Sequence, residues 1–572
     1  MKWLDYPALS FRGQAYPSVS QRKPQYDVIL VSGDAYVDHP AFPTAVVCRC
    51  LEKLGLSVAI IAQPDWSSDQ DFLAWGVPAR FFAVVPGAMD SMVANYTATG
   101  MPRSTDRLSP GGKAGLRPKR AAQVYVQKIK QLFKNIPVVL GGVEASMRRF
   151  VHYDFWEDRL RDPILFDAPA DILVYGMAES VLERVVEWLI MPQRPAIPVI
   201  PQTCVRIRHD SWRSVLQKEP LILPSVAECR SDKNAFMQMS LTIDRIIRPD
   251  GPILVQQHPK GDILSFPPDR EDLQREAELM GEIQYNRRVH PLYQEPVPAL
   301  EPVQFSIQSH RGCVGACTFC ALSLHQGRVI RSRPAQSILK EAAGFVEHPD
   351  FKGVIPDVGG PAVNMYGWQC AVEGCSNGIC SEAELCRSMS GSLKPLANLL
   401  QRIAEIKGIR HVFVGSGLRY DLIREDEWQI FERIVFGHVS GQLKVAPEHF
   451  DRRVLQLMRK GAGVDFAQFA GRFYQSCRQH GKKLFLVPYL MSAFPGCEDN
   501  DVILAQKVRE LKLAHEQIQE FTPTPGSLAT AMYYCQTDCR GKPVKILKNR
   551  NQRLATRKQL HHNKNQLPRR KK

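Results

Sequence analysis

Three cysteines in one short stretch carry the clearest chemical signal of the sequence. Cys313, Cys317 and Cys320 have C-x3-C-x2-C spacing, directly after the apolar run at residues 303–307. Thiolates are soft ligands that favour iron–sulfur clusters or zinc over hard cations. A zinc site usually takes paired cysteine knuckles, and the first spacing here does not fit a lone knuckle. We therefore expect a [4Fe–4S] cluster with three irons held and the fourth open, with structural zinc or unrelated buried thiols as alternatives.

The elements before these cysteines predict a parallel sheet. Apolar runs at residues 26–33 and 57–62 read as buried strands, with a helix at 41–54 between them. The alternation resumes with a helix at 121–134, strands at 136–142 and 171–176, and a helix at 179–189. Strand–helix–strand order with short links implies parallel strands, so we expect a doubly wound α/β sheet. Ligands in such sheets bind beyond the carboxyl ends of the strands.

A second alternating series follows the cysteines. We expect helices at 337–346, 393–406, 425–436, 464–480 and 503–515, and strands at 303–307, 351–356, 411–417, 442–446, 483–488 and 517–521. Six strands with helices between them predict a partial (β/α)6 barrel whose chemistry lies at the strand carboxyl ends. The expected parts are an N-terminal extension (1–25), a Rossmann-like domain (26–195), a connecting segment (196–300), the barrel (301–535) with a Cys-rich insertion (365–390), and a basic tail (536–572) that is partly disordered.

Charge and composition narrow the setting of the protein. The net charge is +16, but residues 541–572 hold twelve Lys or Arg and no acidic residue. Subtracting those twelve charges leaves +4 for the rest, so any affinity for RNA phosphates would come from this tail. Asp5 and Pro7 interrupt the N-terminus, which argues against a signal peptide, and no apolar run reaches membrane-spanning length. We expect a cytoplasmic location, where clustered cysteines bind metal more often than they form disulfides.

The chain resembles the YgiQ-type (UPF0313) family of radical S-adenosylmethionine (SAM) proteins. The resemblance covers residues 27–554 and includes long blocks at 141–149, 152–156, 170–177, 357–361, 415–421, 443–449 and 519–525. It implies a radical SAM barrel after a sheet similar to cobalamin-binding domains. It also implies an enzyme whose cluster cleaves SAM reductively to a 5′-deoxyadenosyl radical that acts on an unknown substrate, with a one-electron reductant such as flavodoxin or ferredoxin.

The same resemblance assigns roles to particular residues. Cys313, Cys317 and Cys320 would ligate the cluster, and Phe319 is the aromatic residue that the superfamily prefers before the third cysteine. Gly359 and Gly360 match the glycine pair whose backbone approaches the SAM amino group, where a Cβ would block access. Candidates for the SAM ribose and carboxylate are Ser416 and Arg419, with a strand-end turn and a surface arginine as the alternative. For a proton donor or substrate contact, the candidates are Glu448 and His449.

Two departures from the family pattern concern further cofactors. The cobalamin motif D-x-H-x-x-G is absent, since Asp38 and His39 are adjacent. We therefore expect no cobalamin bound through that motif, while cobalamin held without a protein ligand stays open. The insertion resembles a second metal site of the family with different spacing, so it predicts a second cluster or zinc, with metal-free thiols as the alternative. Its cysteines are Cys370, Cys375, Cys380 and Cys386.

Other functions fit parts of the chain. A methylthiotransferase acting on tRNA would explain the basic tail and the second cysteine group, but such enzymes carry their extra cysteines in an N-terminal domain. A cobalamin-dependent methylating enzyme and a non-enzymatic zinc or iron–sulfur scaffold are the remaining alternatives. Co-purified tRNA, cobalt content and SAM binding separate these functions.

Overall fold

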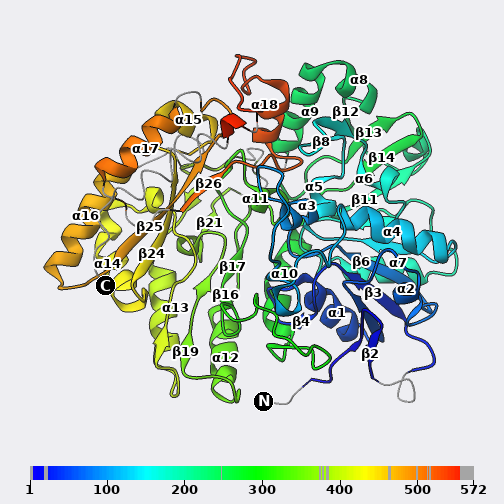
Figure 1. Ribbon diagram of the computed structural model, residues 1–572, viewed down its shortest axis with the longest axis horizontal. Coiled ribbons are helices and arrows are strands. Elements are labelled where there is room, and N and C mark those ends of the chain that lie inside the picture. The colour runs from blue at the N-terminus through cyan, green and yellow to red at the C-terminus, as the bar shows by residue number, and fades with distance from the viewer. Residues whose placement is uncertain are drawn as a thin grey trace. The chain divides into compact units, whose positions relative to one another are not determined.

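The computed structural model describes residues 4–17, 23–246, 248–372, 375, 379–381, 385–460, 465–497, 500–511, 513, 517–549 and 551–553 (Figure 1). The chain forms two compact units. The first comprises Met1–Thr242 and Ile246–Gln304, and the second comprises Ile243–Arg245 and Phe305–Lys572. Most of the expected basic tail, residues 554–572, lies outside the described residues.

An 11-stranded sheet forms the framework of the first unit, in the order β12-β13-β14-β11-β10-β7-β6-β3-β5-β1-β2. Its strands are β1 (Ala8–Phe11), β2 (Gln14–Tyr16), β3 (Val28–Ser32), β5 (Val58–Ala62), β6 (Phe81–Val85), β7 (Val138–Leu140), β10 (Ile172–Val174), β11 (Thr203–Ile207), β12 (Leu221–Leu223), β13 (Leu254–His258) and β14 (Gly261–Ser265). Every residue of β3, β5 and β6 is buried. Continuous apolar runs of this kind are typical of parallel strands covered on both faces. The run from β10 to β1 is parallel throughout, which confirms the expected parallel sheet.

The helices of the first unit follow the expected alternation. They are α1 (Pro43–Lys53), α2 (Gln70–Leu73), α3 (Ser91–Asn95), α4 (Ala121–Leu132), α5 (Val143–Met147), α6 (Ile164–Asp167), α7 (Leu182–Ile190), α8 (Val226–Ser231), α9 (Lys233–Arg245) and α10 (Arg270–Glu282). Short pairs β4 (Val37–Asp38) with β15 (Arg288–Val289), and β8 (His152–Asp154) with β9 (Arg159–Arg161), lie outside the main sheet. Pro43 stands in the first turn of α1, where its missing N–H costs no hydrogen bond.

Two features of this unit differ from the sequence-based expectation. The segment at 196–300 is more than a connection, because β11, β13 and β14 extend the main sheet through antiparallel pairs and β12 pairs with β13. Strand β6 was not expected, although it lies between β3 and β7. Its five apolar residues form a run too short to separate a strand from a buried helix turn by periodicity.

Consecutive parallel pairing organises the second unit. Its paired strands are β16 (Ile307–Gln308), β17 (His310–Arg311), β18 (Arg331–Ser332), β19 (Val354–Ile355), β20 (Val358–Gly359), β21 (Gln369–Cys370), β22 (Met389–Ser390), β23 (His411–Val412), β24 (Gln442–Glu448), β25 (Phe485–Ser492) and β26 (Gln517–Glu520). Parallel pairs join β16 to β20, β19 to β23, β24 to β25 and β25 to β26. A backbone bridge between Leu418 and Val445 links the segment that follows β23 to β24. All six expected strand regions therefore pair in chain order, while the size of a barrel stays a prediction.

Helices separate these strands as the sequence predicts. They are α11 (Ala321–His325), α12 (Ala335–Val346), α13 (Lys394–Ala404), α14 (Trp428–His438), α15 (Arg452–Leu457), α16 (Phe466–Gln479), α17 (Asn500–Glu510) and α18 (Leu528–Cys535). Figure 1 shows α16 and α17 along the outer side of β24 and β25. One apolar core joins strand and helix residues, among them Ile355, Leu400 and Phe473. Among the described residues, the helices are too short or too polar for any of them to span a membrane.

Candidate functional site

The three cysteines lie on a loop that opens the second unit's strand series. The antiparallel pair of β17 with β18 precedes and follows this loop, and α11 begins directly after Cys320. Gly312 turns the chain with φ +79°, and a Cβ there would lie 1.9 Å from the carbonyl oxygen of Val329. Glycine is required at this position both for the backbone conformation and for the close approach. The loop is therefore bent at its first cysteine by a residue that has no substitute.

Contacts from distant parts of the chain fix the middle of the loop. Thr318 donates its N–H to the carbonyl oxygen of Met458 at 3.1 Å and its hydroxyl to that of Leu457 at 2.9 Å. The carbonyl oxygen of Thr318 accepts the N–H of Ala529 at 2.9 Å. Phe319 packs edge-to-face on Phe494, with ring centroids 6.2 Å apart. The expected aromatic residue thus supports the loop from its apolar side.

Two of the thiols and one guanidinium converge on Gly315. A Cβ at Gly315 would lie 2.6 Å from Arg419 Nη1, 3.4 Å from Cys313 Sγ and 3.7 Å from Cys317 Sγ. Burial raises the pKa of the Cys313 thiol, and the positive charge of Arg419 acts in the opposite direction. Burial, and then the other two thiols, raises the pKa of Cys320 to about 12. Metal coordination would supply the positive charge that three neighbouring thiolates require.

The spacing of the sulfur atoms bears on which metal group fits. Ligand atoms around a tetrahedral zinc, with bonds of about 2.0–2.3 Å, lie only about 3.3–3.8 Å apart. Among the described residues, one set of three His, Cys, Asp or Glu donors has all its atoms within 4.8 Å, and it does not include the three loop cysteines. At least two of their sulfur atoms therefore lie too far apart for one tetrahedral ion, which favours a group that offers a separate iron to each thiolate. The residues present therefore fit a cluster better than a single zinc ion.

The glycine pair after β19 is closely packed. A Cβ at Gly359 would lie 2.2 Å from Ser416 Oγ, and one at Gly360 would lie 2.4 Å from His310 Cε1. The carbonyl oxygen of Gly359 accepts the N–H of Ser309 at 2.8 Å and its hydroxyl at 3.0 Å. Both glycines thus have a packing reason for lacking a side chain, beside the expected contact with SAM.

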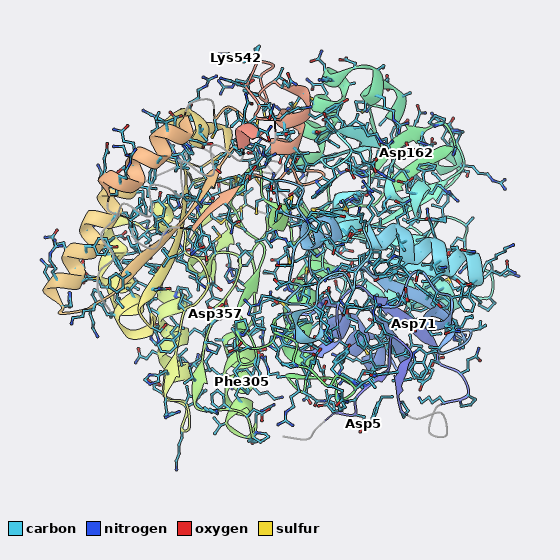
Figure 2. The ribbon with its side chains drawn as sticks, in the orientation of Figure 1. Asp5, Asp71, Asp162, Phe305, Asp357 and Lys542 are labelled. Carbon is cyan, nitrogen blue, oxygen red and sulfur yellow. The ribbon has the colours of Figure 1, made fainter. Side chains whose placement is uncertain are left out.

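Ser416 belongs to a small network around Asp357, which Figure 2 labels in the second unit. One carboxylate oxygen of Asp357 accepts the N–H groups of Gly415 at 2.8 Å and Ser416 at 2.9 Å, and the other accepts the Ser416 hydroxyl. Asp357 therefore fixes the turn after β23 by capturing three donors. The Ser416 hydroxyl is a donor to this carboxylate, and not a free donor at the strand end.

Arg419 is a buried residue, and not the surface arginine of the alternative interpretation. It donates from Nε to Asp421 Oδ1 at 2.8 Å and from Nη2 to Asp421 Oδ2 at 2.6 Å. The Asn364 side chain fixes its backbone, accepting the Arg419 N–H at 3.1 Å and donating to its carbonyl oxygen at 3.0 Å. With one edge of the guanidinium committed to Asp421, the side facing the thiols is Nη1.

Glu448 and His449 follow one another at the end of β24 but face different surroundings. Glu448 has φ +66°, a left-handed conformation that is rare without glycine, and its carboxylate lies 3.5 Å from Lys460 Nζ. Burial raises the pKa of Glu448, and Lys460 opposes that shift. His449 instead points its Nε2 towards Cys497, 3.8 Å from the sulfur. Strain at the end of a barrel strand is common at functional sites.

The insertion cysteines lie beside the first cysteine loop. Cys380 packs in the same apolar cluster as Val314 and Cys313, and a backbone bridge joins Ser381 to Gly315. Burial, and then the charges of Cys386, Cys370 and Cys375, raises the pKa of Cys380 to about 11. The other three thiols are thus close enough to Cys380 to affect it, and the bridge from Ser381 joins the insertion to the cysteine loop.

In the first unit, buried ion pairs occupy the carboxyl ends of the central strands. Arg117 Nη2 lies 2.6 Å from Asp34 and 3.2 Å from Asp106. A Cβ at Gly33 would lie 1.8 Å from the carbonyl oxygen of Pro86, so the ends of β3 and β6 are in direct backbone contact. These contacts join the carboxyl ends of the two neighbouring strands and neutralise the buried charge of Arg117.

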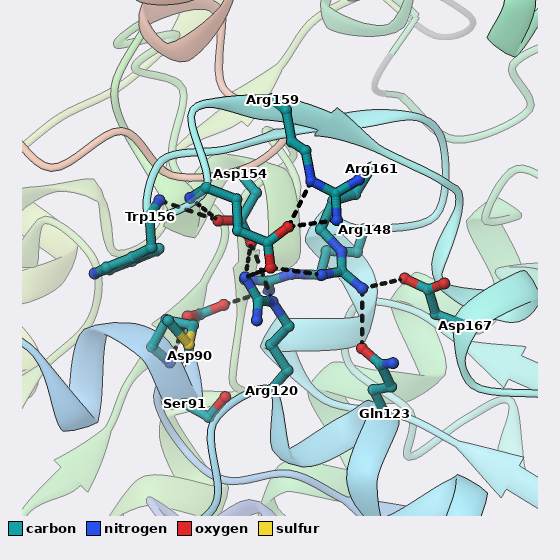
Figure 3. Close-up of polar contacts among 12 residues, drawn as sticks. Asp90, Ser91, Arg120, Gln123, Arg148, Asp154, Trp156, Arg159, Arg161 and Asp167 are labelled. Carbon is teal, nitrogen blue, oxygen red and sulfur yellow. Dashed lines mark hydrogen bonds and ion pairs between the residues drawn. The ribbon is translucent and has the colours of Figure 1, made fainter.

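Further ion pairs tie the sequence blocks at 141–149 and 152–156 to other parts of the first unit (Figure 3). Arg148 pairs with Asp90, and Arg120 Nη2 lies 2.8 Å from Asp154. Arg161 donates to Asp167 at 2.6 Å and to Gln123 at 3.2 Å. Buried charges of this kind are retained only when they are paired. A residue in each of these two blocks therefore has a structural role in this unit.

Sequence reasoning did not identify Asp357, Asn364, Asp421 or Lys460. Asp357 and Asp421 lie inside the recognised blocks at 357–361 and 415–421, so the blocks were the available signal. Nothing in the local sequence of Asn364 or Lys460 marks them, because their partners lie 55 and 12 positions away in the chain, at Arg419 and Glu448.

Comparison with known proteins gives the family and the fold. The family model described as Radical SAM N-terminal matches residues 18–306. A UPF0313 protein of Methanosarcina mazei is 41% identical over 577 residues, covering 94% of this chain and 92% of the relative. A UPF0313 protein of Clostridium perfringens is 41% identical over 524 residues, covering 90% and 79%.

Solved structures show the same fold at low sequence identity. The radical SAM methyltransferase TsrM of Kitasatospora setae, with tryptophan substrate and a SAM analogue bound, has a TM-score of 0.51 at 13% identity and covers 94% of this chain and 89% of its own. A second TsrM structure, with cobalamin and a [4Fe–4S] cluster bound, also has a TM-score of 0.51 at 13% identity and covers 91% and 87%. Similarity at this identity concerns the fold alone.

Proposed function

Because the chain belongs to the UPF0313 family of radical SAM proteins, we propose that it is an enzyme that binds a [4Fe–4S] cluster and SAM in its second unit. Cys313, Cys317 and Cys320 hold the cluster. When bound, the cluster supplies the electron that cleaves SAM and generates a 5′-deoxyadenosyl radical, which takes a hydrogen atom from the substrate. The observation that carries this proposal is the convergence of Cys313, Cys317 and Arg419 on Gly315.

The residues of the chain determine the setting for this chemistry. The three thiols lie on one loop that Thr318 and Phe319 support from both sides. Arg419 places a positive charge beside two of them and is itself positioned by Asp421. Hydrogen bonds and charges near cluster sulfurs set the reduction potential. We therefore assign Arg419 to the cluster, and not to the SAM carboxylate.

SAM approaches through backbone contacts in this proposal. The turn at Gly359 and Gly360 presents main chain without side chains, and Gly359 lies in β20, which pairs with β16. Ser416 acts indirectly, since its hydroxyl is bonded to Asp357. Pro361 offers no side-chain donor or acceptor at the following position. Substrate orientation and exclusion of water then depend on the residues at the ends of β24 and β25.

We further propose that Cys370, Cys375, Cys380 and Cys386 hold a second iron–sulfur cluster. The mutual effects of these thiols on Cys380 and the bridge from Ser381 to Gly315 support this assignment. A cluster held by these thiols would supply electron-transfer chemistry to a segment that contacts the first cysteine loop. Zinc is the alternative ion for the same four thiols, and RNA binding through the basic residues at 541–572 is a separate proposal.

Cobalamin is the cofactor on which the fold comparison and the residues disagree. The TsrM structure contains cobalamin, which favours a methylating enzyme as the second candidate function. In this chain the ends of β3 and β6 are in contact and Arg117 fills the adjoining space with buried ion pairs. We propose that no cobalamin inserts between these strand ends. The cobalt content of the purified protein tests this statement directly.

The proposed reaction is tested by anaerobic reconstitution with iron and sulfide. Dithionite and SAM are then added, 5′-deoxyadenosine is measured by mass spectrometry, and iron is counted per chain. We expect product with about four irons for one cluster or about eight for two. The variant Cys317→Ala should lose both iron and product, whereas Cys477→Ala, a buried cysteine on α16, should keep both.

Other outcomes separate the alternatives. Product formed by Cys317→Ala would contradict the assignment of the cluster. Zinc without iron, and no product, would identify a structural metalloprotein. If a chain with all four insertion cysteines changed to serine bound as much iron as the unchanged chain, those cysteines would hold no second cluster.

A further inference from the structure

A histidine, a cysteine and an aspartate come together at the ends of β24 and β25. His449 follows β24, Cys497 lies five residues beyond the end of β25, and Asp501 is in the first turn of α17. Their ligand atoms lie within 4.8 Å of one another, and all three side chains are buried. His449 Nε2 is 3.8 Å from Cys497 Sγ and 4.0 Å from Asp501 Oδ1. These residues form the His–Cys–Asp group.

One carboxylate oxygen of this group has no partner. Asp501 is 5% exposed, and its Oδ2 accepts the N–H of Ala493 at 3.1 Å. Its Oδ1 faces the other two side chains and has no hydrogen bond among the described residues. A buried oxygen without a partner costs about 1–3 kcal/mol. The oxygen therefore marks a place where a bound ion would remove an existing cost.

The electrical surroundings favour a cation. The negative charge of Asp451 acts to raise the pKa of both Cys497 and His449. The negative charge of Glu520 acts to raise the pKa of Asp501. Glu520 itself pairs with Arg553, but no Lys or Arg among the described residues forms an ion pair with His449, Cys497 or Asp501. A buried group of acidic side chains with a thiol and an imidazole thus lacks a positive partner.

We propose that His449, Cys497 and Asp501 bind a zinc ion. Thiolate, imidazole and carboxylate are the three ligand types of protein zinc sites, at about 2.0–2.3 Å from the ion. Such ligands lie about 3.3–3.8 Å apart in a tetrahedral site, so the group, whose ligand atoms lie within 4.8 Å of one another, has to contract by up to about 1 Å on binding the ion. The fourth position belongs to water or to a substrate atom. This site is separate from both cysteine groups and does not depend on the proposed function.

An arrangement for proton transfer along a triad does not fit the same atoms. In a triad the carboxylate and the thiol contact opposite nitrogens of the imidazole. Here both face Nε2, while Nδ1 accepts the N–H of Asp451 at 2.9 Å. In the ion-free chain Nε2 therefore carries the ring proton. Zinc bound at Nε2 would need the ring proton at Nδ1, so the hydrogen bond from the Asp451 N–H to Nδ1 would have to open, and the Cys497 thiol would release its proton to water.

The site would also have a structural consequence for the cysteine loop. Cys497 donates its N–H to the carbonyl oxygen of Phe494 at 2.9 Å, and Phe494 packs on Phe319. An ion that ties Cys497 to the end of β24 would hold Phe494 against the loop. Zinc at this place would therefore stabilise the support of the proposed cluster without taking part in electron transfer.

The test uses the full chain, stripped of metals anaerobically and loaded with zinc or cobalt(II). Metal content is measured by mass spectrometry, and cobalt binding by the thiolate-to-cobalt charge-transfer absorption. We expect Cys497→Ser and Asp501→Asn each to lose about one equivalent of ion relative to the unchanged chain. The matched variants Cys477→Ser and Asp465→Asn, on α16 and at its N-cap, should lose none.

A second measurement guards against a folding defect. Zinc should raise the thermal unfolding midpoint of Asp501→Asn less than that of Asp465→Asn, since only the latter retains the complete group. Equal zinc and cobalt binding by Cys497→Ser, Asp501→Asn and the unchanged chain would overturn the proposal. So would zinc binding that disappears only with the insertion cysteines. Loss of 5′-deoxyadenosine formation has no bearing on either result.

Discussion

Gly360 lies against the imidazole ring of His310, so closely that a Cβ on the glycine would come within 2.4 Å of Cε1 and 2.6 Å of Nδ1. His310 is fully buried and its Nδ1 is 2.9 Å from the hydroxyl of Ser309. The ring has no open side to which it can move. We expect Gly360→Ala to destabilise the protein by about 1–3 kcal/mol, because it overpacks this contact.

Chemical denaturation measures this effect, and Gly417→Ala is its control. Gly417 also follows a strand end of the second unit, but a Cβ there would meet no atom within 4 Å. Its unfolding midpoint should stay near that of the unchanged chain. Equal midpoints for both variants would show that the His310 ring adapts.

Replacing Arg419 should make the proposed cluster harder to reduce. Arg419→Gln removes the positive charge that converges with Cys313 and Cys317 on Gly315. We expect the midpoint potential to fall by on the order of 60 mV, which equals about 1.4 kcal/mol for one electron. A redox titration followed by electron paramagnetic resonance measures the shift. The exposed Arg424→Gln should leave the potential unchanged, and an equal shift in both variants would contradict a local role for Arg419.

His290 should make the stability of the first unit depend on pH. Its ring is fully buried among Tyr6, Tyr16, Tyr36 and Tyr293, and burial lowers its pKa to about 4. The unfolded chain binds a proton at this residue below about pH 6.5, whereas the folded chain does so only below about pH 4. The contribution of the neutral His290 ring to the free energy of unfolding is therefore complete above about pH 6.5, and it is lost as the pH falls towards about 4.

At pH 5 this loss amounts to about 2 kcal/mol. Denaturation of the unchanged chain and of His290→Phe at pH 7.5 and pH 5 measures it. We expect a smaller decrease for the variant, which has no ring nitrogen to protonate. The same decrease in both chains would assign the pH dependence to other groups.

Arg117 should be essential to the stability of the first unit. It is 2% exposed and pairs with Asp34 and Asp106, so its removal leaves two buried carboxylates without their cation. We expect Arg117→Met to cost about 3–5 kcal/mol in the free energy of unfolding. Arg213→Met, at a side chain that is 62% exposed, should cost far less in the same measurement. A small effect at Arg117 would mean that water enters the strand ends.

The sequence predicts those features that depend on local pattern. The strands β3, β5, β7 and β10 were expected from apolar runs, and the first cysteine loop from its spacing. Strand β6 was missed because a short apolar run does not show whether it forms a strand of a sheet or a buried turn of a helix. The strands β11 to β14 were missed because their segment is rich in Pro and charge, and only pairing with the existing sheet makes them strands.

Contacts between distant segments account for the rest of the site. Arg419 was recognised within a block, but the direction of its side chain depends on Asp421 and Asn364. No spacing rule connects those two residues to the cysteines. His449, Cys497 and Asp501 come from two strand ends and a helix. Their approach follows from the parallel register of β24 and β25, which periodicity alone does not determine.

The attachment of Thr318 to Leu457, Met458 and Ala529 sets an order for biosynthesis. A ribosome that has just made the three loop cysteines has not yet made any of the partners that shape their loop. The loop can take its final form only after the chain has been synthesised through residue 529. A cluster of the proposed kind would therefore be inserted after translation of nearly the whole protein, and a truncated chain would leave the ribosome with its cysteines exposed to oxidation.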